Sequence, residues 1–162
     1  MDTYQTHHHQ INPAYHKLCI VVDTNILLGG ITLLEYLLDC YYVSEQFIIC
    51  IPWGVVLELD GLRKSKHNER RGRAYRANYW INTVLKKYRK NVVFQTIEED
   101  LETANISQNI DDRIFLSTSQ LKENGDNVIL LTNDINLQNK AAIHDIHCCG
   151  SDTILHNIQF YI

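Results

Sequence analysis

Several acidic residues of this sequence are placed where their carboxylates could share one metal ion. Asp23 directly follows an apolar run, and Asp134 comes shortly after another. Glu58 and the pair Asp111 and Asp112 belong to stretches with helical periodicity. Clustered carboxylates repel one another unless they are protonated or bridged by a cation. Such oxygen ligands suit Mg²⁺ or Mn²⁺, which also accept phosphate oxygens, so they indicate hydrolysis of a phosphodiester by metal-activated water.

A basic segment begins just after Glu58 and favours a phosphate-rich partner. The stretch from Arg63 to Lys90 holds 11 of the 15 basic residues and one acid, Glu69, although the net charge of the chain is −4. Few ion pairs between residues one helical turn apart are therefore expected. A solvated charged surface is the alternative to a binding surface for a phosphate backbone. The candidate phosphate-binding residues are Arg63, Lys64, Lys66, Arg70, Arg71 and Arg73.

The predicted elements would bring the carboxylates to one edge of a sheet. Apolar runs without alternation, typical of strands buried on both faces, occur at Leu18–Val22, Phe47–Ile51, Val92–Phe94 and Val128–Leu131. Helical patterns occur at Ile31–Leu38, from Trp53 into the basic segment, and at Arg73–Lys90, Asp111–Leu121 and Leu137–Ile143. This alternation predicts an α/β fold, a three-layer α/β/α sandwich with a central parallel sheet. In such sheets ligands bind beyond the carboxyl ends of the strands, where Asp23 and Asp134 are expected.

Length and composition fit one globular domain. The chain has 162 residues, of which 45% are hydrophobic and 21% charged. We expect residues 1–16, which are polar and His-rich, to form a flexible arm, and residues 17–162 to form a single domain with an edge strand at Ile158–Ile162. No apolar run approaches the roughly 20 residues that span a bilayer, and no signal peptide is visible. Five cysteines without a C-x-x-C pair predict reduced thiols in a nuclear or cytosolic protein.

Four short motifs resemble, in order, those of the PIN-domain ribonucleases. They are Val21–Leu27, Val55–Leu62, Asn109–Ile114 and Leu130–Leu137, and the resemblance covers roughly residues 17 to 160. It implies a PIN-like sandwich and an endoribonuclease that uses Mg²⁺ or Mn²⁺ to cleave single-stranded RNA, leaving 5′-phosphate and 3′-hydroxyl ends. The second and third motifs are most similar to the eukaryotic mRNA-surveillance subgroup, and within it to a nuclear endoribonuclease of mRNP quality control. That implies a nuclear protein, also possible in the cytoplasm, whose longer parent reaches mRNP or nuclear-pore-associated proteins, with no membrane partner.

The resemblance also implies a role for each matched position. The catalytic and metal-binding residues would be Asp23, Glu58, Asp111 and Asp134, with Asp112 as the alternative to Asp111 or its supporting partner. Asn25 would support Asp23, and Thr132 would order water or phosphate. The sequence departs from the family at Ile110, where a polar residue is frequent, but this change removes no ligand.

Other interpretations stay open at the level of sequence. Taken singly, the three aspartates that begin helical patterns are ordinary helix caps, and Glu58 is a solvated helix residue. The alternative function is an inactive or weakly active RNA-binding scaffold. A phosphatase resembling the haloacid dehalogenases would need a second Asp where Asn25 stands, and a ribonuclease based on histidine would not need metal. The aromatic residues Tyr75, Tyr79, Trp80 and Tyr88 are expected in the core rather than stacked on bases.

Overall fold

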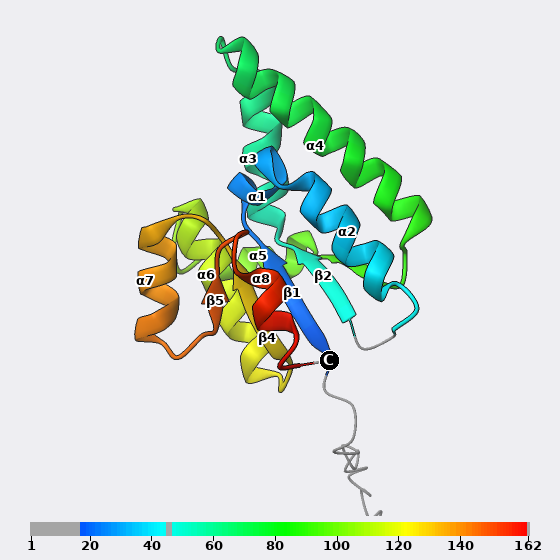
Figure 1. Cartoon of the computed structure of the whole chain (residues 1–162). Helices are drawn as coiled ribbons and strands as arrows, with labels where there is room; N and C mark the ends of the chain where they lie inside the picture. The colour runs from blue at the N-terminus through cyan, green and yellow to red at the C-terminus, as the bar shows by residue number, and fades with distance from the viewer. Residues whose placement is uncertain (1–16, 45–46, 162) are drawn as a thin grey trace, which may run out of the picture.

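A sheet of parallel strands forms the centre of the computed structural model (Figure 1), which describes residues 17–44 and 47–161. The strands of this described part are β1 (Leu18–Val22), β2 (Phe47–Ile51), β3 (Val92–Phe94), β4 (Asn127–Leu131) and β5 (Cys148–Cys149). Their order is β3-β2-β1-β4-β5, and every pairing is parallel. The predicted parallel sheet is confirmed, whereas the expected arm, residues 1–16, lies outside the described residues.

Helices connect the strands and complete the α/β/α sandwich. They are α1 (Thr24–Gly29), α2 (Ile31–Tyr41), α3 (Trp53–Arg63), α4 (Asn68–Lys87), α5 (Ile97–Ala104), α6 (Ile110–Glu123), α7 (Ile135–Ile143) and α8 (Ile154–Ile158). Crossovers between parallel strands are right-handed, so connections that run in opposite directions along the sheet cover opposite faces. The helices between β1 and β3 therefore cover one face, and those between β3 and β5 cover the other. Within the described residues, no helix is both long and apolar enough to cross a membrane.

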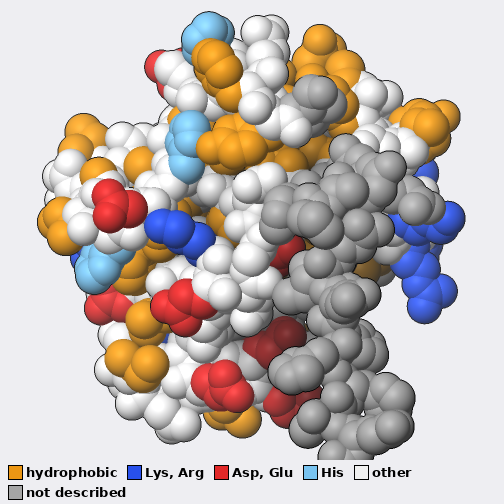
Figure 2. Space-filling view, turned by 90° about the horizontal axis from the view of Figure 1, so that it is seen from below, with side chains coloured by type: hydrophobic (Ala, Val, Ile, Leu, Met, Phe, Trp, Pro, Cys, Tyr) orange, Lys and Arg blue, Asp and Glu red, His pale blue; other side chains and the backbone are white. Residues whose placement is uncertain are grey.

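The α3–α4 hairpin extends beyond the carboxyl ends of the central strands (Figure 1). The opposite face of the molecule, near the amino ends of the strands, is seen in Figure 2. There, acidic, hydrophobic and His side chains are interspersed, and Lys and Arg side chains lie at one margin and also among the acidic side chains (Figure 2). Because the α3–α4 hairpin lies beyond the carboxyl ends of the strands, the basic residues that connect α3 to α4 lie at the same end of the sheet as Asp23.

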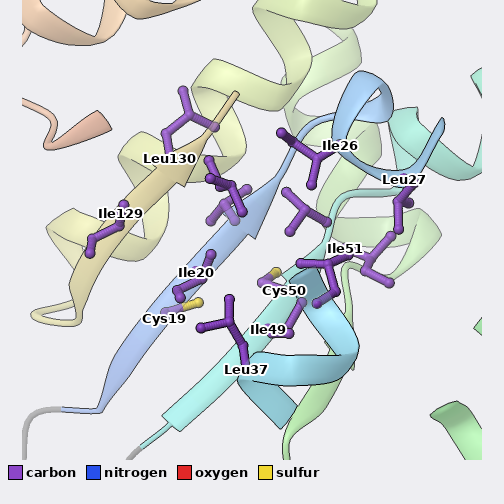
Figure 3. Packing of buried hydrophobic residues seen from close by; sticks show 14 of the residues in the cluster. Cys19, Ile20, Ile26, Leu27, Leu37, Ile49, Cys50, Ile51, Ile129 and Leu130 are labelled. Atoms are coloured by element: carbon purple, nitrogen blue, oxygen red, sulfur yellow. The ribbon is translucent and has the colours of Figure 1, made fainter. Parts of the chain in front are cut away.

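The strand that carries Asp23 is fixed by burial on both faces. All five residues of β1 are buried, as the apolar run predicts for a central parallel strand. Figure 3 shows Ile20 of β1 among Leu37, Ile49 and Ile129, which come from α2, β2 and β4. Close packing of this kind holds the end of β1, and the residue that follows it, in one position.

The structure differs from the predicted elements at the end of the chain. The expected edge strand over Ile158–Ile162 is wrong for its described part, because Ile158 ends α8 and residues 159–161 form turns. Ile154 and Ile158 are both fully buried, and their spacing of four places them on one helical face. The sheet edge is instead β5, two residues long.

Two further helices, α1 and α5, were not predicted, and a third helix, α4, begins earlier than expected. The pattern predicts a helix over Arg73–Lys90, whereas α4 begins at Asn68 and ends at Lys87. Its first turns are joined by a side-chain hydrogen bond from Arg71 to Asn68. The short helix α1 and the acidic helix α5 lack the long apolar stripe that the sequence analysis relied on. Helix α5 is instead defined by a capping box, in which Thr96 and Glu99 bond each other's backbone N–H groups.

Candidate active site

Asp23 is a buried carboxylate at the carboxyl end of the central strand. Its side chain is held on both oxygens, and the residue is only 3% exposed. Oδ1 accepts a hydrogen bond from the backbone N–H of Thr24 at 2.6 Å, so Asp23 is the N-cap of α1. Oδ2 accepts from Nδ2 of Asn25 at 2.5 Å and from Oγ1 of Thr132 at 2.6 Å. The first and fourth motifs therefore meet at this carboxylate.

The environment of Asp23 disfavours its negative charge. The pKa of Asp23 is raised from 3.8 to about 6, and burial is the largest cause, although the hydrogen bonds from Thr132 and Thr24 act in the opposite direction. The negative charges of Asp111 and Glu58 are smaller contributions to this rise in pKa. These two residues come from different helices, so the fold brings three of the predicted ligands within electrostatic reach of one another. A bound cation would relieve their repulsion.

Glu58 is positioned by α3 and by the residue next to Asp23. Its Oε2 accepts a hydrogen bond from Oγ1 of Thr24 at 2.6 Å. One turn earlier in the same helix, Gly54 faces α6 so closely that a Cβ there would lie 3.4 Å from Cγ2 of Ile110. Ile110 directly precedes Asp111, so this contact sets the distance between the second and third motifs. The apolar residue at 110, where the family frequently has a polar one, is part of that packing.

The two aspartates of the third motif have different surroundings. Asn109, rather than either aspartate, is the N-cap of α6. Asp112 forms an ion pair with Lys140 of α7 and accepts a hydrogen bond from Ser107 at 3.0 Å. Lys140 lowers the pKa of Asp112. Asp112 is thus engaged by a cation of the protein itself, whereas Asp111 acts electrostatically on Asp23.

Asp134 begins α7 and is linked to Asp23 through a shared threonine. Its Oδ1 accepts from the backbone N–H groups of Asn136 at 2.7 Å and Leu137 at 3.1 Å. Its own N–H donates to Oγ1 of Thr132 at 3.0 Å, while that hydroxyl donates to Asp23. Asp23 and Asp134 are therefore both helix caps, as the simpler interpretation states. Capping leaves Oδ2 of Asp134 without a partner among the described residues.

The carboxylates are near one another without forming a closed ligand set. No group of three or more His, Cys, Asp or Glu side chains within residues 17–44 and 47–161 is arranged to hold a metal ion. The donors are nevertheless carboxylate oxygens, and the buried, mutually repelling group around Asp23 fits a hard divalent cation in chemistry. Asp23, Glu58, Asp111 and Asp134 are the residues that could hold it.

Two polar residues of this site were not identified from the sequence. Thr24 orients Glu58, and Lys140 lies near three acidic side chains, because Asp112, Asp111 and Asp134 all raise its pKa. Thr24 belongs to the first motif and directly follows Asp23, which is the only sequence signal for it. The spacing of six residues between Asp134 and Lys140 follows no motif, and only the packing of α7 against α6 brings Lys140 to Asp112.

The predicted phosphate-binding residues lie around the connection between α3 and α4, and half of them have acidic partners. Arg63 and Lys64 lie 3.6 and 3.5 Å from Asp60, and Arg73 lies 2.5 Å from Glu69. The expectation that local ion pairs would be scarce is therefore wrong, since Asp60 lies just before the basic segment. These pairs are exposed and contribute little to stability, so phosphate groups can compete for the same side chains. The other predicted residues, Lys66, Arg70 and Arg71, are exposed as well.

The aromatic residues of α4 are divided between the core and the surface. Trp80 and Tyr88 are buried, as expected. Tyr75 and Tyr79 are exposed, so their assignment to the core is wrong. The buried face of α4 is formed by Ala74, Ala77, Trp80 and Val84, and the two tyrosines lie outside that stripe.

Comparisons with known proteins agree with this architecture. Residues 20–152 match the family model of the PIN domain. The chain is 31% identical over 149 residues to human "Transcriptional protein SWT1", covering 88% of the chain and 17% of the relative. It is 32% identical over 151 residues to the protein of the same name from Saccharomyces cerevisiae, covering 84% of the chain and 32% of the relative. The chain thus spans about a third or less of the length of these two relatives. Both relatives are eukaryotic proteins, and they confirm the narrower resemblance predicted from the second and third motifs.

Solved structures with the same fold include other PIN domains. The PIN domain of human SMG5 superposes with a TM-score of 0.51 at 18% identity, covering 82% of this chain and 93% of that one. A domain of a functionally unknown protein from Methanocaldococcus jannaschii gives a TM-score of 0.54 at 24% identity, covering 82% and 89%. These structures share the fold, and the family match over most of the sequence, with the two SWT1 relatives, shows that the chain belongs to the PIN-domain family, whose fold is generally that of a metal-dependent nuclease.

Proposed function

We propose that this domain is an endoribonuclease that cleaves single-stranded RNA with the help of Mg²⁺ or Mn²⁺. The observation that carries the proposal is the buried carboxylate of Asp23, on which Asp111 and Glu58 act electrostatically at the carboxyl end of β1. Family membership supports the same reaction class. The exposed basic residues around the α3–α4 connection supply positive charge for a phosphate backbone at the same end of the sheet.

Each residue of the proposed site has a part that follows from its contacts. Asp23, Glu58, Asp111 and Asp134 would hold the ion, which when bound activates water and neutralises charge on the phosphodiester. Asn25 and Thr132 fix the Asp23 carboxylate, and Thr24 fixes that of Glu58. Asp112 is a supporting residue in this proposal, because it holds Lys140. That ion pair places one positive charge beside the acidic group, where it can orient a phosphate oxygen.

The biological setting is proposed from the relatives. Both SWT1 proteins are named transcriptional proteins, which supports a nuclear location, with the cytoplasm as a further possible site. We propose a role in nuclear mRNA or mRNP quality control. Contacts with mRNP or nuclear-pore-associated proteins would be made by other parts of a longer protein.

Cleavage of a labelled single-stranded RNA tests the proposed reaction. The assay compares Mn²⁺, Mg²⁺ and excess chelator for the wild type, Asp134→Asn and Glu123→Gln. Asn caps a helix as well as Asp does, so Asp134→Asn removes the charge while keeping the start of α7. Glu123 is an exposed acid at the far end of α6 from Asp111, so Glu123→Gln is a matched control for loss of one negative charge.

The proposal predicts metal-dependent cleavage that Asp134→Asn lowers by about 100-fold or more, as expected when a group that stabilises the transition state is lost. Glu123→Gln should cleave as the wild type does. Cleavage that persists in chelator and leaves 2′,3′-cyclic phosphate would contradict the metal mechanism and favour histidine chemistry. RNA binding without cleavage under every condition would favour the scaffold alternative.

A further inference from the structure

A largely apolar groove lies between α2 and α4, outside the acidic site. It has a volume of about 520 Å³, and its lining includes Ile31, Glu35, Tyr75, Arg76, Tyr79 and Trp80. The two helices lie side by side (Figure 1). They are joined at their C-terminal ends, where the hydroxyl of Tyr88 donates a hydrogen bond to Asp39. The groove is therefore a feature of the folded helix pair.

Two large aromatic rings in this groove are unusually exposed. Tyr75 is 53% exposed and Tyr79 is 77% exposed. Their spacing of four residues places both rings on the same face of α4. The guanidinium carbon of Arg63 lies 5.1 Å from the centre of the Tyr75 ring. Exposed apolar groups gathered in a groove are typical of a surface that binds a partner.

The charge around the groove favours a negatively charged occupant. Helix α4 carries six basic residues, of which Arg73 and Lys87 have acidic partners, and Arg76 lines the groove itself. Glu35 of α2 is the acidic residue in the lining. Aromatic rings beside cationic side chains are the combination by which proteins bind single-stranded nucleic acids, since bases stack on the rings and phosphates bind the cations.

Trp80 adds a hydrogen-bond donor without a partner. It lines the groove and is 4% exposed. Its Nε1 is buried and has no acceptor among the described residues. Buried indole N–H groups usually find an acceptor. An oxygen of a base or of a phosphate is an acceptor of the required kind, and it would reach this nitrogen only after a neighbouring side chain moves.

The groove is also close to the proposed active site. Helix α4 packs against α1, and α1 is capped by Asp23. Helix α2 follows α1 after a single residue, Gly30. A strand of RNA that occupied both places would thus continue from the acidic site onto the α2–α4 surface.

We propose that this groove binds bases of single-stranded RNA that flank the cleaved phosphodiester, by stacking on Tyr75 and Tyr79. The inference rests on the proposed function, because it takes RNA as the substrate. It goes further by dividing the RNA-binding surface into a cleavage site and a separate stacking site. The stacking site affects only substrates long enough to reach it.

The test measures binding of a 12-nucleotide single-stranded RNA in excess chelator, so that cleavage plays no part. Tyr79→Ala removes the more exposed ring, Tyr79→Phe retains it, and Phe160→Ala removes a ring that is 73% exposed beyond α8. We expect the Kd for Tyr79→Ala to rise roughly tenfold, within the range that loss of one stacked base gives. Tyr79→Phe and Phe160→Ala should bind as the wild type does. Cleavage of a dinucleotide in Mn²⁺ should be unchanged in all three variants.

A second measurement follows the two tryptophan indole N–H groups by NMR. We expect the Trp80 resonance to shift when RNA is added. Wild-type binding by Tyr79→Ala, with an unmoved Trp80 resonance, would overturn the inference and favour an apolar protein segment as the occupant. That result would leave the proposed function intact. A wild type that binds no RNA would overturn both.

Discussion

At the scale of single residues, the pKa of Asp23 couples the acidic site to stability. Its pKa lies near 6 in the fold and near 3.8 in the unfolded chain. Between these values the folded state binds more protons than the unfolded state, so stability falls as pH rises from about 4 to about 6. Above pH 6 the ionised Asp23 lowers the free energy of unfolding by its full amount, which is ~3 kcal/mol at 1.36 kcal/mol per pKa unit.

The stability of Asp23→Asn relative to the wild type should therefore increase as pH rises in the metal-free protein. Asn keeps one oxygen to accept hydrogen bonds and has no charge to bury. We expect the difference in free energy of unfolding between Asp23→Asn and the wild type to grow by ~3 kcal/mol from pH 4 to pH 7.5. Urea unfolding in chelator measures it, with Glu123→Gln as the control that should show no such trend. A difference independent of pH would contradict this account of Asp23.

The sequence also shows how far single residues can be predicted. The four acidic motifs were recognisable because each lies at a strand end or in a short local pattern. Of the partners that hold them, Asn25 was predicted, and it lies only two positions from Asp23. Thr132 was predicted to order water or phosphate rather than to bond Asp23, and Lys140 was not predicted at all, because these two contacts span more than 25 positions of sequence. Asp60 was missed for a simpler reason, since it lies three residues outside the basic segment that was analysed.

At the scale of elements, a buried ion pair holds the helix that carries Asp111. Arg113 of α6 makes two hydrogen bonds with the carboxylate of Asp100 on α5, and the two side chains are 10% and 4% exposed. The sequence analysis did not predict α5, so this pair was beyond its reach. The pair connects α5 to the first turn of α6 and thereby helps to position the third motif.

Removing one partner of this pair should be costly. Asp100→Asn leaves the Arg113 charge buried and uncompensated, which should lower the free energy of unfolding by about 3–5 kcal/mol. Replacing both residues, as Asp100→Leu with Arg113→Met, should restore much of the loss. Urea unfolding compares the variants, with Glu98→Gln on the exposed side of α5 as the control. Equal stability of Asp100→Asn and the wild type would show that the pair is not buried in solution.

The two glycines of α3 provide a matched test of how closely α3 approaches α6. Gly54 faces Ile110, whereas a Cβ at Gly61 would meet nothing within 4 Å. Gly61→Leu should stabilise the protein by about 0.5–1 kcal/mol, because Leu is a better helix former than Gly. Gly54→Leu should destabilise it by about 1–3 kcal/mol through overpacking, and should also slow cleavage by moving Glu58 away from Asp111. If both variants gain stability in thermal unfolding, the close approach of the two helices is wrong.

At the scale of the whole molecule, hydrophobic pattern and motif order were sufficient for the fold. Continuous apolar runs such as Leu18–Val22 predicted a parallel sheet, and that sheet brings Asp23 and Asp134 to one edge. Surface features were harder to predict, because exposure depends on which helices pack against which. Tyr75 and Tyr79 follow helical spacing as core residues do, yet α2 leaves a groove beside them.

The most direct test of the account is the end chemistry of RNA cleaved by the wild type and by Asp23→Asn in Mn²⁺. Asn retains the cap of α1 and removes the buried charge on which the site depends. The account predicts 5′-phosphate and 3′-hydroxyl products from the wild type and loss of cleavage by at least about 100-fold in Asp23→Asn. Undiminished cleavage by a folded Asp23→Asn would contradict it.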